Sequence, residues 1–310
     1  MPFPADSALH IDRALSTASQ NYKNAEYIGS KIFPRVKVDK DSDKIFLYKK
    51  GDKFLRDNTL IGDSSRAQEA YFTMDTPISF ATELHGLAGF VSYAKQAKAD
   101  APLKPLVDQT NYLTEKLYFD HEHEAATVAF TSGNFASANK ATPTTKWGNA
   151  SSTPIADIHT AIDALVGIPK PYTAAIGLSA FRKLSTHPDI LGAFQYAVEK
   201  GVAATAEQIA AYFGFDELIV GEAQKNTASR GATPSYSRIW DDHMLIFRRE
   251  TGLREDMTAF GFTLEFETFQ TLRWEDLSLG SGGEWVKPTW NYQIKGIDFT
   301  AGYLIYDVVA

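Results

Sequence analysis

The sequence predicts an α+β protein, and three observations carry that prediction. Residues 106–131 have the apolar spacing of one long helix. Short helices and short buried strands alternate between residues 151 and 220, as in α/β units. The final third is dominated by strand patterns. The chain has 310 residues, 44% of them hydrophobic, which is enough for a large core in one elaborate domain or two.

Residues 1–36 are predicted to form an extended arm with a short helix, which ends at Phe33-Pro34 because proline disfavours helix in the residue before it. The arm carries Tyr22, Tyr27 and Phe33 outside any obvious core. We therefore expect these rings to be buried against a neighbouring subunit. An edge strand of the chain's own domain is the alternative, and propensity alone does not separate the two.

Residues 37–75 are predicted to form a long, highly charged, two-stranded loop. Residues 45–48 read as a strand, Lys50-Gly51-Asp52 as a turn, and residues 70–73 as the returning strand. An isolated hairpin is at best marginally stable in water. We expect another chain to support this loop.

The middle of the chain combines a spine helix with a smaller α/β unit. The helix over residues 106–131 follows a strand at residues 78–84 and should stop at Ser132-Gly133-Asn134. A polar connector covers residues 134–153. The elements expected after it are a helix from Thr153-Pro154, a strand at 173–176, helices at 179–187 and 189–200, a helix from the Thr205/Gln208 capping box to Gly214, and a strand at 218–220.

The final third is predicted to be β-rich. After a polar loop at residues 223–236, strands are expected at residues 239–247 and around residues 262–266. Residues 278–284 read as a turn, and residues 290–309 as two terminal strands.

No residue pattern indicates catalysis or a bound cofactor. The chain has no cysteine, which removes thiol nucleophiles and thiolate metal ligands. His121 and His123 are two residues apart, whereas a helical zinc pair needs a spacing of four. We interpret His121-Glu122-His123-Glu124 as a solvated helix face.

Two weaker candidates have structural interpretations as well. Asp241-Asp242-His243 lies between strand residues without a nucleophile nearby. Ser179 lacks the second glycine of a nucleophile elbow and reads as a helix N-cap. We predict no catalytic, cofactor-binding or metal residues, no cofactor, and no enzymatic activity.

Charge and hydropathy exclude two further classes of function. Asp and Glu total 38 against 31 Lys and Arg, giving a net charge of −7, which argues against a surface built to grip nucleic-acid phosphates. No stretch approaches the roughly 18 apolar residues of a membrane span. The N-terminal residues MPFPADSALHIDR lack a secretory signal, so we expect the chain to stay in the cytoplasm where it is made.

Several segments, taken in order along nearly the whole chain, resemble one family. They are ALSTASQNYKNAEYIGSKIFPRVKVDKDSDKIFLYKKGD, the long helix, KWGNASSTPIADIHTAIDAL, AAIGLSAFRKLSTHPDIL, TAEQIAAYFGFDELIVGEA and the β-rich end. This order is similar to that of the tailed-bacteriophage major capsid proteins, whose fold is shared with encapsulin shells and the floor domain of herpesvirus capsids.

The resemblance implies a division of the chain. Residues 1–36 would be the N-terminal arm, 37–75 the extended loop, 76–150 a peripheral domain with the spine helix, 151–284 the axial domain, and 285–310 terminal strands that complete the peripheral domain.

The resemblance also implies a function. The chain would assemble with itself, as hexamers and pentamers, into the icosahedral shell of a tailed phage, enclosing double-stranded DNA without sequence-specific binding. A portal protein and a separate scaffolding protein are expected partners, a decoration protein is an optional one, and the expected location is the virion after assembly in the host cytoplasm. An encapsulin-like compartment around a cargo enzyme is the alternative, and a soluble α/β hydrolase with Ser179 as nucleophile is a third.

Overall fold

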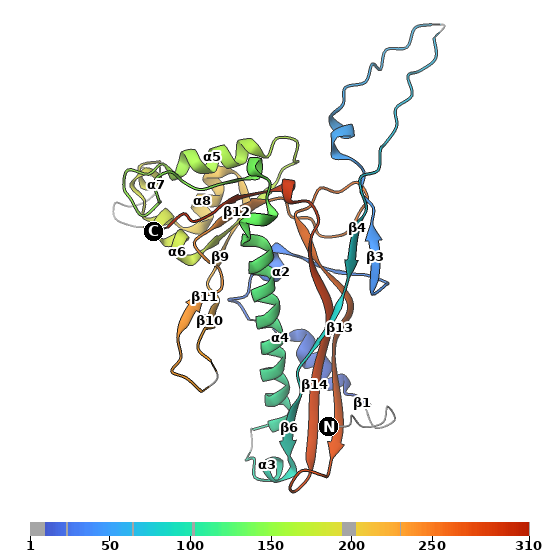
Figure 1. Cartoon of the computed structure of the whole chain (residues 1–310), viewed down its shortest axis with the longest axis vertical. Helices are drawn as coiled ribbons and strands as arrows, with labels where there is room; N and C mark the ends of the chain where they lie inside the picture. The colour runs from blue at the N-terminus through green and yellow to red at the C-terminus, as the bar shows by residue number, and fades with distance from the viewer. Residues whose placement is uncertain are drawn as a thin grey trace.

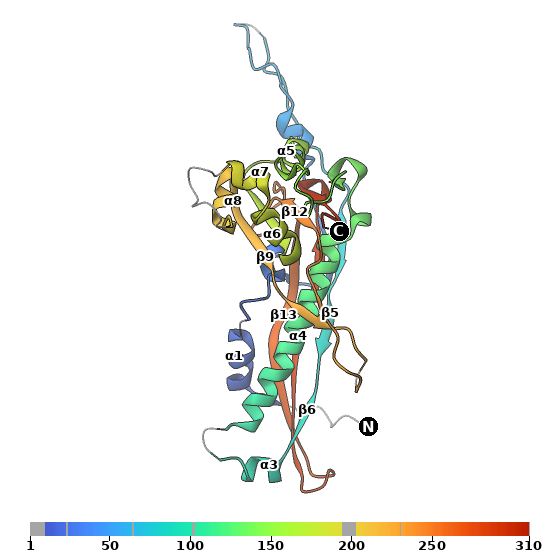
Figure 2. The same cartoon turned by 90° about the vertical axis from the view of Figure 1, so that its left-hand side faces the viewer.

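Two β-sheets joined by one long helix make up the body of the protein, and a loop projects from it (Figure 1). In the computed structural model the helix runs along the longer sheet and reaches the smaller sheet at its carboxyl end (Figures 1 and 2). Among the described residues, no helix combines the length and the apolar character of a membrane span. The structure describes residues 10–22, 24–63, 65–100, 103–193, 203–229 and 231–309.

The long sheet is built on an antiparallel hairpin of β13 and β14, whose register shifts near Glu267. On the far side of β14 lie β5 and β6, both antiparallel to it. On the far side of β13 lie β1, antiparallel, and β2, parallel. The strands are β1 (His10–Ile11), β2 (Arg35–Lys37), β5 (Glu83–Gly86), β6 (Gly89–Ser92), β13 (Gly261–Asp276) and β14 (Gly283–Gly296).

The spine helix α4 (Pro105–Phe130) confirms the long helix predicted from the sequence. Proline is tolerated in its first turn because the amide that proline lacks would have no helical partner there. Its inward side chains, including Leu117 and Tyr118, pack against Phe269 and Trp290 of the long sheet. A short turn over Ser132–Asn134 follows it, as predicted.

The small sheet has the strand order β7-β15-β12-β8-β9. Alternate residues serve different layers, because successive side chains in a strand point to opposite faces. Ile176 and Ile246 face a core that includes the helix residues Ile158 and Ile209, whereas Leu245 lies in the cluster that holds the end of α4. The strands are β7 (Lys140–Ala141), β8 (Tyr172–Gly177), β9 (Phe215–Gly221), β12 (Met244–Phe247) and β15 (Gly302–Ile305).

The remaining elements are short. The helices are α1 (Arg13–Asn21), α2 (Gly29–Ile32), α3 (Tyr93–Ala97), α5 (Pro154–Ala164), α6 (Leu178–Ser185), α7 (Pro188–Ala193) and α8 (Ala206–Phe213), with 3-10 turns at Lys50–Phe54, Ser132–Asn134, Ser137–Asn139 and Phe299–Ala301. Two further strand pairs are β3 (Ser42–Ile45) with β4 (Ile78–Ala81) and β10 (Gln224–Asn226) with β11 (Tyr236–Arg238).

Local signals placed several of these elements correctly. The Thr205/Gln208 capping box opens α8, and Gly214 closes it with a φ of 71°, a conformation that glycine adopts without steric cost. The strand expected at residues 239–247 is shorter, because only Met244–Phe247 pairs. The predicted helix at 189–200 is seen as Pro188–Ala193, and residues 194–200 lie outside the described residues.

The sheets divide the chain differently from the predicted boundaries. The β13–β14 hairpin spans the predicted boundary between residues 284 and 285. Residues 261–276 therefore belong to the long sheet, and residues 302–305 belong to the small one. The turn predicted at residues 278–284 joins β13 to β14, and a short connection of this kind lets two consecutive strands pair as an antiparallel hairpin.

The N-terminal arm packs on its own chain, so the expectation of burial against a neighbour is wrong for Phe33. Its side chain is 0% exposed, and its ring centroid lies 5.5 Å from that of Phe260. The Tyr22 ring stacks on Tyr118 at 5.9 Å, and Tyr27 is partly buried beside the same helix. The alternative interpretation, edge strands of the chain's own domain, describes β1 and β2. Residues 1–9 lie outside the described residues.

This packing predicts slow amide exchange in unassembled subunits. The amide of Val38 donates to Glu265, that of Phe33 to Gly29, and β2 pairs with β13. Residues 28–38 should therefore be protected to a similar degree in free subunits and in any assembly. Hydrogen exchange with mass spectrometry measures this directly, and fast exchange limited to free subunits would contradict it.

Candidate functional site

The loop between β3 and β4 is held only at its base. The two strands pair from Ser42 opposite Ala81 to Ile45 opposite Ile78, and an isolated bridge joins Tyr48 to Met74. Beyond the 3-10 turn Lys50–Phe54, the described residues up to 73 form no helix or strand. The loop therefore extends away from the body, as the blue to cyan segment in Figure 1 shows.

Polar contacts anchor the base of the loop to its own chain. Lys50 Nζ lies 2.9 Å from Asp298 Oδ2, and Lys53 forms an ion pair with Asp256. Across the loop, the amide of Thr73 donates to Asp52 Oδ2 at 2.8 Å. These contacts fix the direction in which the loop leaves the body.

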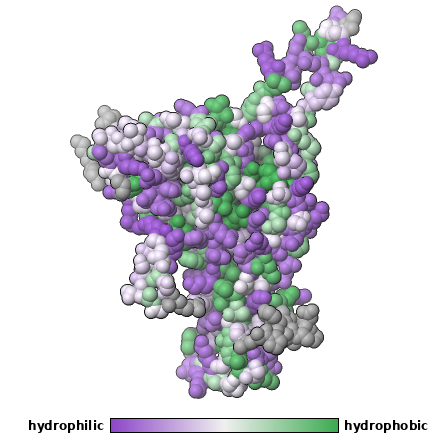
Figure 3. Space-filling model, in the orientation of Figure 1, coloured by the Kyte–Doolittle hydropathy of each residue, from purple (hydrophilic) through white to green (hydrophobic). Residues whose placement is uncertain are grey.

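The outer part of the loop exposes large apolar side chains. Leu60 is 85% exposed and Phe72 is 72% exposed. Figure 3 shows apolar and charged residues together on the projection. The large apolar residues exposed along it are Phe46, Phe54, Leu55, Leu60, Ile61, Tyr71, Phe72 and Met74.

These side chains need a covering surface. Fully burying a leucine, isoleucine or phenylalanine contributes about 1.5–3 kcal/mol, and contiguous exposed apolar groups on a soluble chain mark interaction sites. The loop cannot supply that burial itself, because its two limbs hold no packed core. Its geometry fits docking on another protein surface, and support of the loop by another chain stays a prediction.

Glu122 of the spine helix α4 accepts hydrogen bonds from distant parts of the chain. This carboxylate is 1% exposed and accepts three hydrogen bonds. The donors are the amide of Ile28 at 2.8 Å, the amide of Gly29 at 2.7 Å and the indole nitrogen of Trp240 at 2.6 Å. Burial raises the pKa of Glu122, and the backbone donors oppose that shift by favouring the charged form.

Glu122 therefore connects three parts of the chain: the arm, the spine helix and the segment before β12. The approach is close, since a Cβ added at Gly29 would lie 2.8 Å from Ala125 Cβ and from Glu122 Oε2. The interpretation of His121-Glu122-His123-Glu124 as a solvated helix face is wrong for Glu122. Nothing in the spacing of the motif revealed its partners, which are distant in sequence.

The same interpretation is wrong for His121, which is buried as well. Its Nε2 lies 3.0 Å from Thr263 Oγ1, and that hydroxyl donates to the carbonyl of Phe33. His121 Nε2 is therefore the donor in its own contact. Burial, with a smaller effect from the charge of Arg35, lowers the pKa of His121 to about 3, so the ring stays neutral. His123 lies elsewhere and accepts a hydrogen bond from Lys225, so the two histidines do not share a face.

The other two candidates have structural roles. His243 Nδ1 accepts from the amide of Asp307 at 3.0 Å, and Asp242 accepts from the Ser179 hydroxyl. Ser179 is not the N-cap of α6, because Gly177 holds that position. These contacts connect α6 and the segment after β15 to the loop before β12.

Relatives with curated names cover most of the chain. The major capsid protein of Pseudomonas phage JBD67 is 29% identical over 266 residues, which are 84% of this chain and 83% of that protein. The major capsid protein of Burkholderia phage BcepMu is 28% identical over 223 residues, 69% of each chain. A scan against family models found no match.

Solved structures give the same result for the fold. A phage-related protein from Bordetella bronchiseptica RB50 superposes with a TM-score of 0.73 at 21% identity, over 96% of this chain and 97% of that one. This chain is a homologue of phage major capsid proteins. It shares their fold, as the capsid of cyanophage P-SCSP1u also illustrates, with a TM-score of 0.59 at 11% identity over 93% and 90% of the two chains.

The major capsid fold also extends to encapsulins. An encapsulin from Synechococcus elongatus PCC 7942 superposes with a TM-score of 0.52 at 11% identity, over 97% of this chain and 96% of that one. That likeness concerns the fold alone. The relatives named from sequence are capsid proteins, so the encapsulin alternative is the weaker one.

Proposed function

We propose that this chain is the major capsid protein of a tailed bacteriophage, which assembles with copies of itself into the icosahedral shell around double-stranded DNA. The observation that carries the proposal is the projecting loop, whose apolar side chains are exposed in the single chain, on a fold that capsid shells use. A repeated contact between different surfaces of identical subunits closes into rings and shells when the rotation permits.

In this proposal the two sheets correspond to the two domains of a capsid subunit. The long sheet with α4 is the peripheral domain, and the small sheet with α5 to α8 is the axial domain that meets its copies around hexamer and pentamer axes. The terminal hairpin β13–β14 belongs to the peripheral domain. The loop over residues 46–77 and the contacts around it link neighbouring subunits.

The subunit acts as a structural protein in this account, without enzymatic activity. Its net charge of −7 suits a wall that encloses DNA without adhering to it, because like charges repel. Assembly takes place in the host cytoplasm, with a portal protein, a separate scaffolding protein and, where the phage has one, a decoration protein as partners.

Expression of the chain with its scaffolding and portal proteins tests this proposal. Closed particles should sediment far ahead of free subunits and appear as shells by negative-stain electron microscopy. Particles from infected cells should contain double-stranded DNA. Particles that instead retain a cargo enzyme and no DNA would favour the encapsulin alternative, and a chain that turns over a substrate as a monomer, with loss of turnover in Ser179→Ala, would favour the hydrolase.

A further inference from the structure

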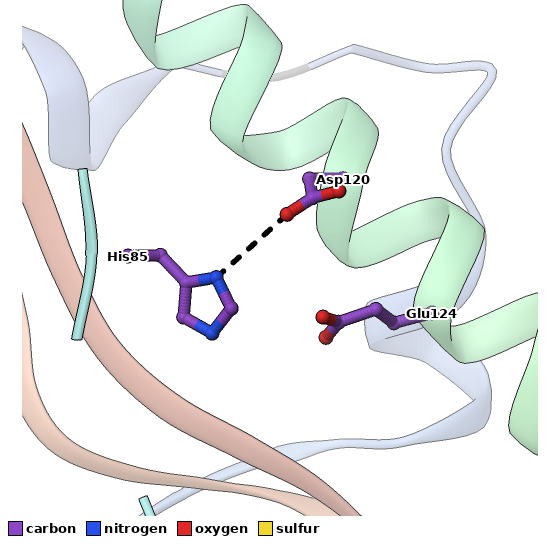
Figure 4. A group of neighbouring side chains, drawn as sticks. All are labelled: His85, Asp120 and Glu124. Carbon is purple, nitrogen blue, oxygen red and sulfur yellow. Dashed lines mark ion pairs between the residues drawn. The ribbon is translucent and has the colours of Figure 1, made fainter. Parts of the chain in front are cut away.

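A second cluster on the spine helix brings one histidine and two carboxylates together. His85 lies on β5, and Asp120 and Glu124 lie one turn apart on α4 (Figure 4). Residues four apart share a helix face, so both carboxylates point toward the imidazole. His85 Nδ1 is 3.7 Å from Asp120 Oδ2, and one ligand atom from each of the three residues lies within 4.8 Å of the others.

The cluster carries an excess of negative charge. Glu83, on the same strand as His85, lies close enough to add to the charge around Glu124. Within the described ranges, no lysine or arginine forms an ion pair with Glu83, Asp120 or Glu124. A cation at this position would compensate that charge.

A buried tyrosine completes the surroundings. Tyr292 is 1% exposed, and its ring stacks on His85 with centroids 4.4 Å apart. Its hydroxyl is buried without a hydrogen bond of good geometry, beside Glu124. His85, Glu124 and Tyr292 line one cleft of about 290 Å³.

We propose that His85, Asp120 and Glu124 bind a divalent first-row transition metal ion, with Zn²⁺ the best match. Zinc lies about 2.0–2.2 Å from nitrogen and oxygen ligands, which places neighbouring ligand atoms roughly 3–4 Å apart. The 3.7 Å separation already fits this range, and the other separations, all within 4.8 Å, require at most a small side-chain movement. An imidazole ligand favours zinc over Mg²⁺ or Ca²⁺, which prefer oxygen ligands.

The remaining groups have defined roles around the ion. In the metal-bound site, the Tyr292 hydroxyl is placed to turn toward the Glu124 carboxylate beside it and donate to it, an outer contact of the kind that orients metal ligands. The fourth ligand is water from the cleft. The ion connects α4 to β5, which follows directly on β4, the strand that returns from the projecting loop. Its binding therefore fixes the base of the loop to the spine helix. This inference does not depend on the proposed function.

Metal content after dialysis tests the site. Free subunits of the full chain are dialysed against a low concentration of Zn²⁺ and then against metal-free buffer, and zinc is measured by inductively coupled plasma mass spectrometry. The expected result is about one zinc ion per chain. Asp120→Asn and His85→Gln should each weaken binding at least tenfold, and bound Co²⁺ should give a visible absorption band that both variants lose.

His123→Gln is the matched control, because His123 lines the same cleft but is not one of the three ligands. This variant should bind zinc like the original chain. Asp120 is 59% exposed, so Asp120→Asn should melt at the same temperature as the original chain in the absence of metal. Zinc at background level in the original chain, or equal binding by Asp120→Asn, overturns the proposal.

Discussion

Replacing residues 55–71 by two glycines is expected to leave folded subunits that no longer form closed shells. The deletion removes Leu55, Leu60, Ile61 and Tyr71, whose exposed side chains contribute little to the isolated subunit. On a neighbour, each fully buried leucine or isoleucine would contribute about 2 kcal/mol, and the loss recurs at every subunit contact. The base of the loop keeps the bridge from Tyr48 to Met74 and the contact from Thr73 to Asp52.

Sedimentation velocity and negative-stain microscopy measure the loss of shells, and circular dichroism checks that the subunits are folded. The double variant Asn58→Ser and Thr59→Ser is the control, because it alters polar residues of the same loop and keeps every apolar one. It should assemble normally. Normal shells from the shortened loop would show that the loop is not an assembly contact.

Glu122→Ala is expected to destabilise the subunit by on the order of 3 kcal/mol. The substitution leaves the amides of Ile28 and Gly29 and the indole of Trp240 without their acceptor, and each unsatisfied buried donor costs about 1–3 kcal/mol. The total destabilisation should lie near the lower end of the summed range, because the structure around the substitution relaxes in part and a buried charge is removed. Urea unfolding of unassembled subunits measures the free energy of unfolding.

Two further variants separate the role of Glu122 from a general effect on the helix. Glu122→Gln keeps one acceptor oxygen but turns an amide group toward a backbone donor. It should therefore lower the free energy of unfolding by less than Glu122→Ala does. Lys116→Ala changes an exposed position on the same helix and should shift stability by less than about 0.5 kcal/mol. If Glu122→Ala lowers the free energy of unfolding no more than Lys116→Ala does, Glu122 does not hold the arm, the spine helix and the segment before β12 together.

The sequence predicted those elements whose signals are local. The spine helix has its apolar spacing and its proline near the start, and α8 has a complete capping box with a closing glycine. The projecting loop was recognisable because a charged two-stranded segment without a core of its own cannot be stable alone.

Features that depend on distant partners were missed. Phe33 was assigned to another subunit because its partner, Phe260, lies far along the chain. Glu122 was placed in solvent because charged residues are rarely buried, and the exception depends on donors from residues 28, 29 and 240. A carboxylate on a long helix with apolar neighbours at three and four residues, here Ala125 and Ala126, was the one available signal of burial.

The cluster of His85, Asp120 and Glu124 could not be predicted from the sequence either. The spacing of the two carboxylates is visible on the helix, but the histidine reaches them only because β5 pairs with β14 beside α4. His121 and His123 lie next to these carboxylates in the sequence, whereas His85 is distant in the sequence and close to them only in the fold.

A cryo-electron microscopy reconstruction of assembled particles, at a resolution that traces the backbone, tests the central claim most directly. The account predicts a closed shell built from this chain, in which residues 46–77 of each subunit lie on a neighbouring subunit and Leu60 and Phe72 are buried there. A closed shell in which these residues extend into solvent, or an assembly that does not close, would contradict it.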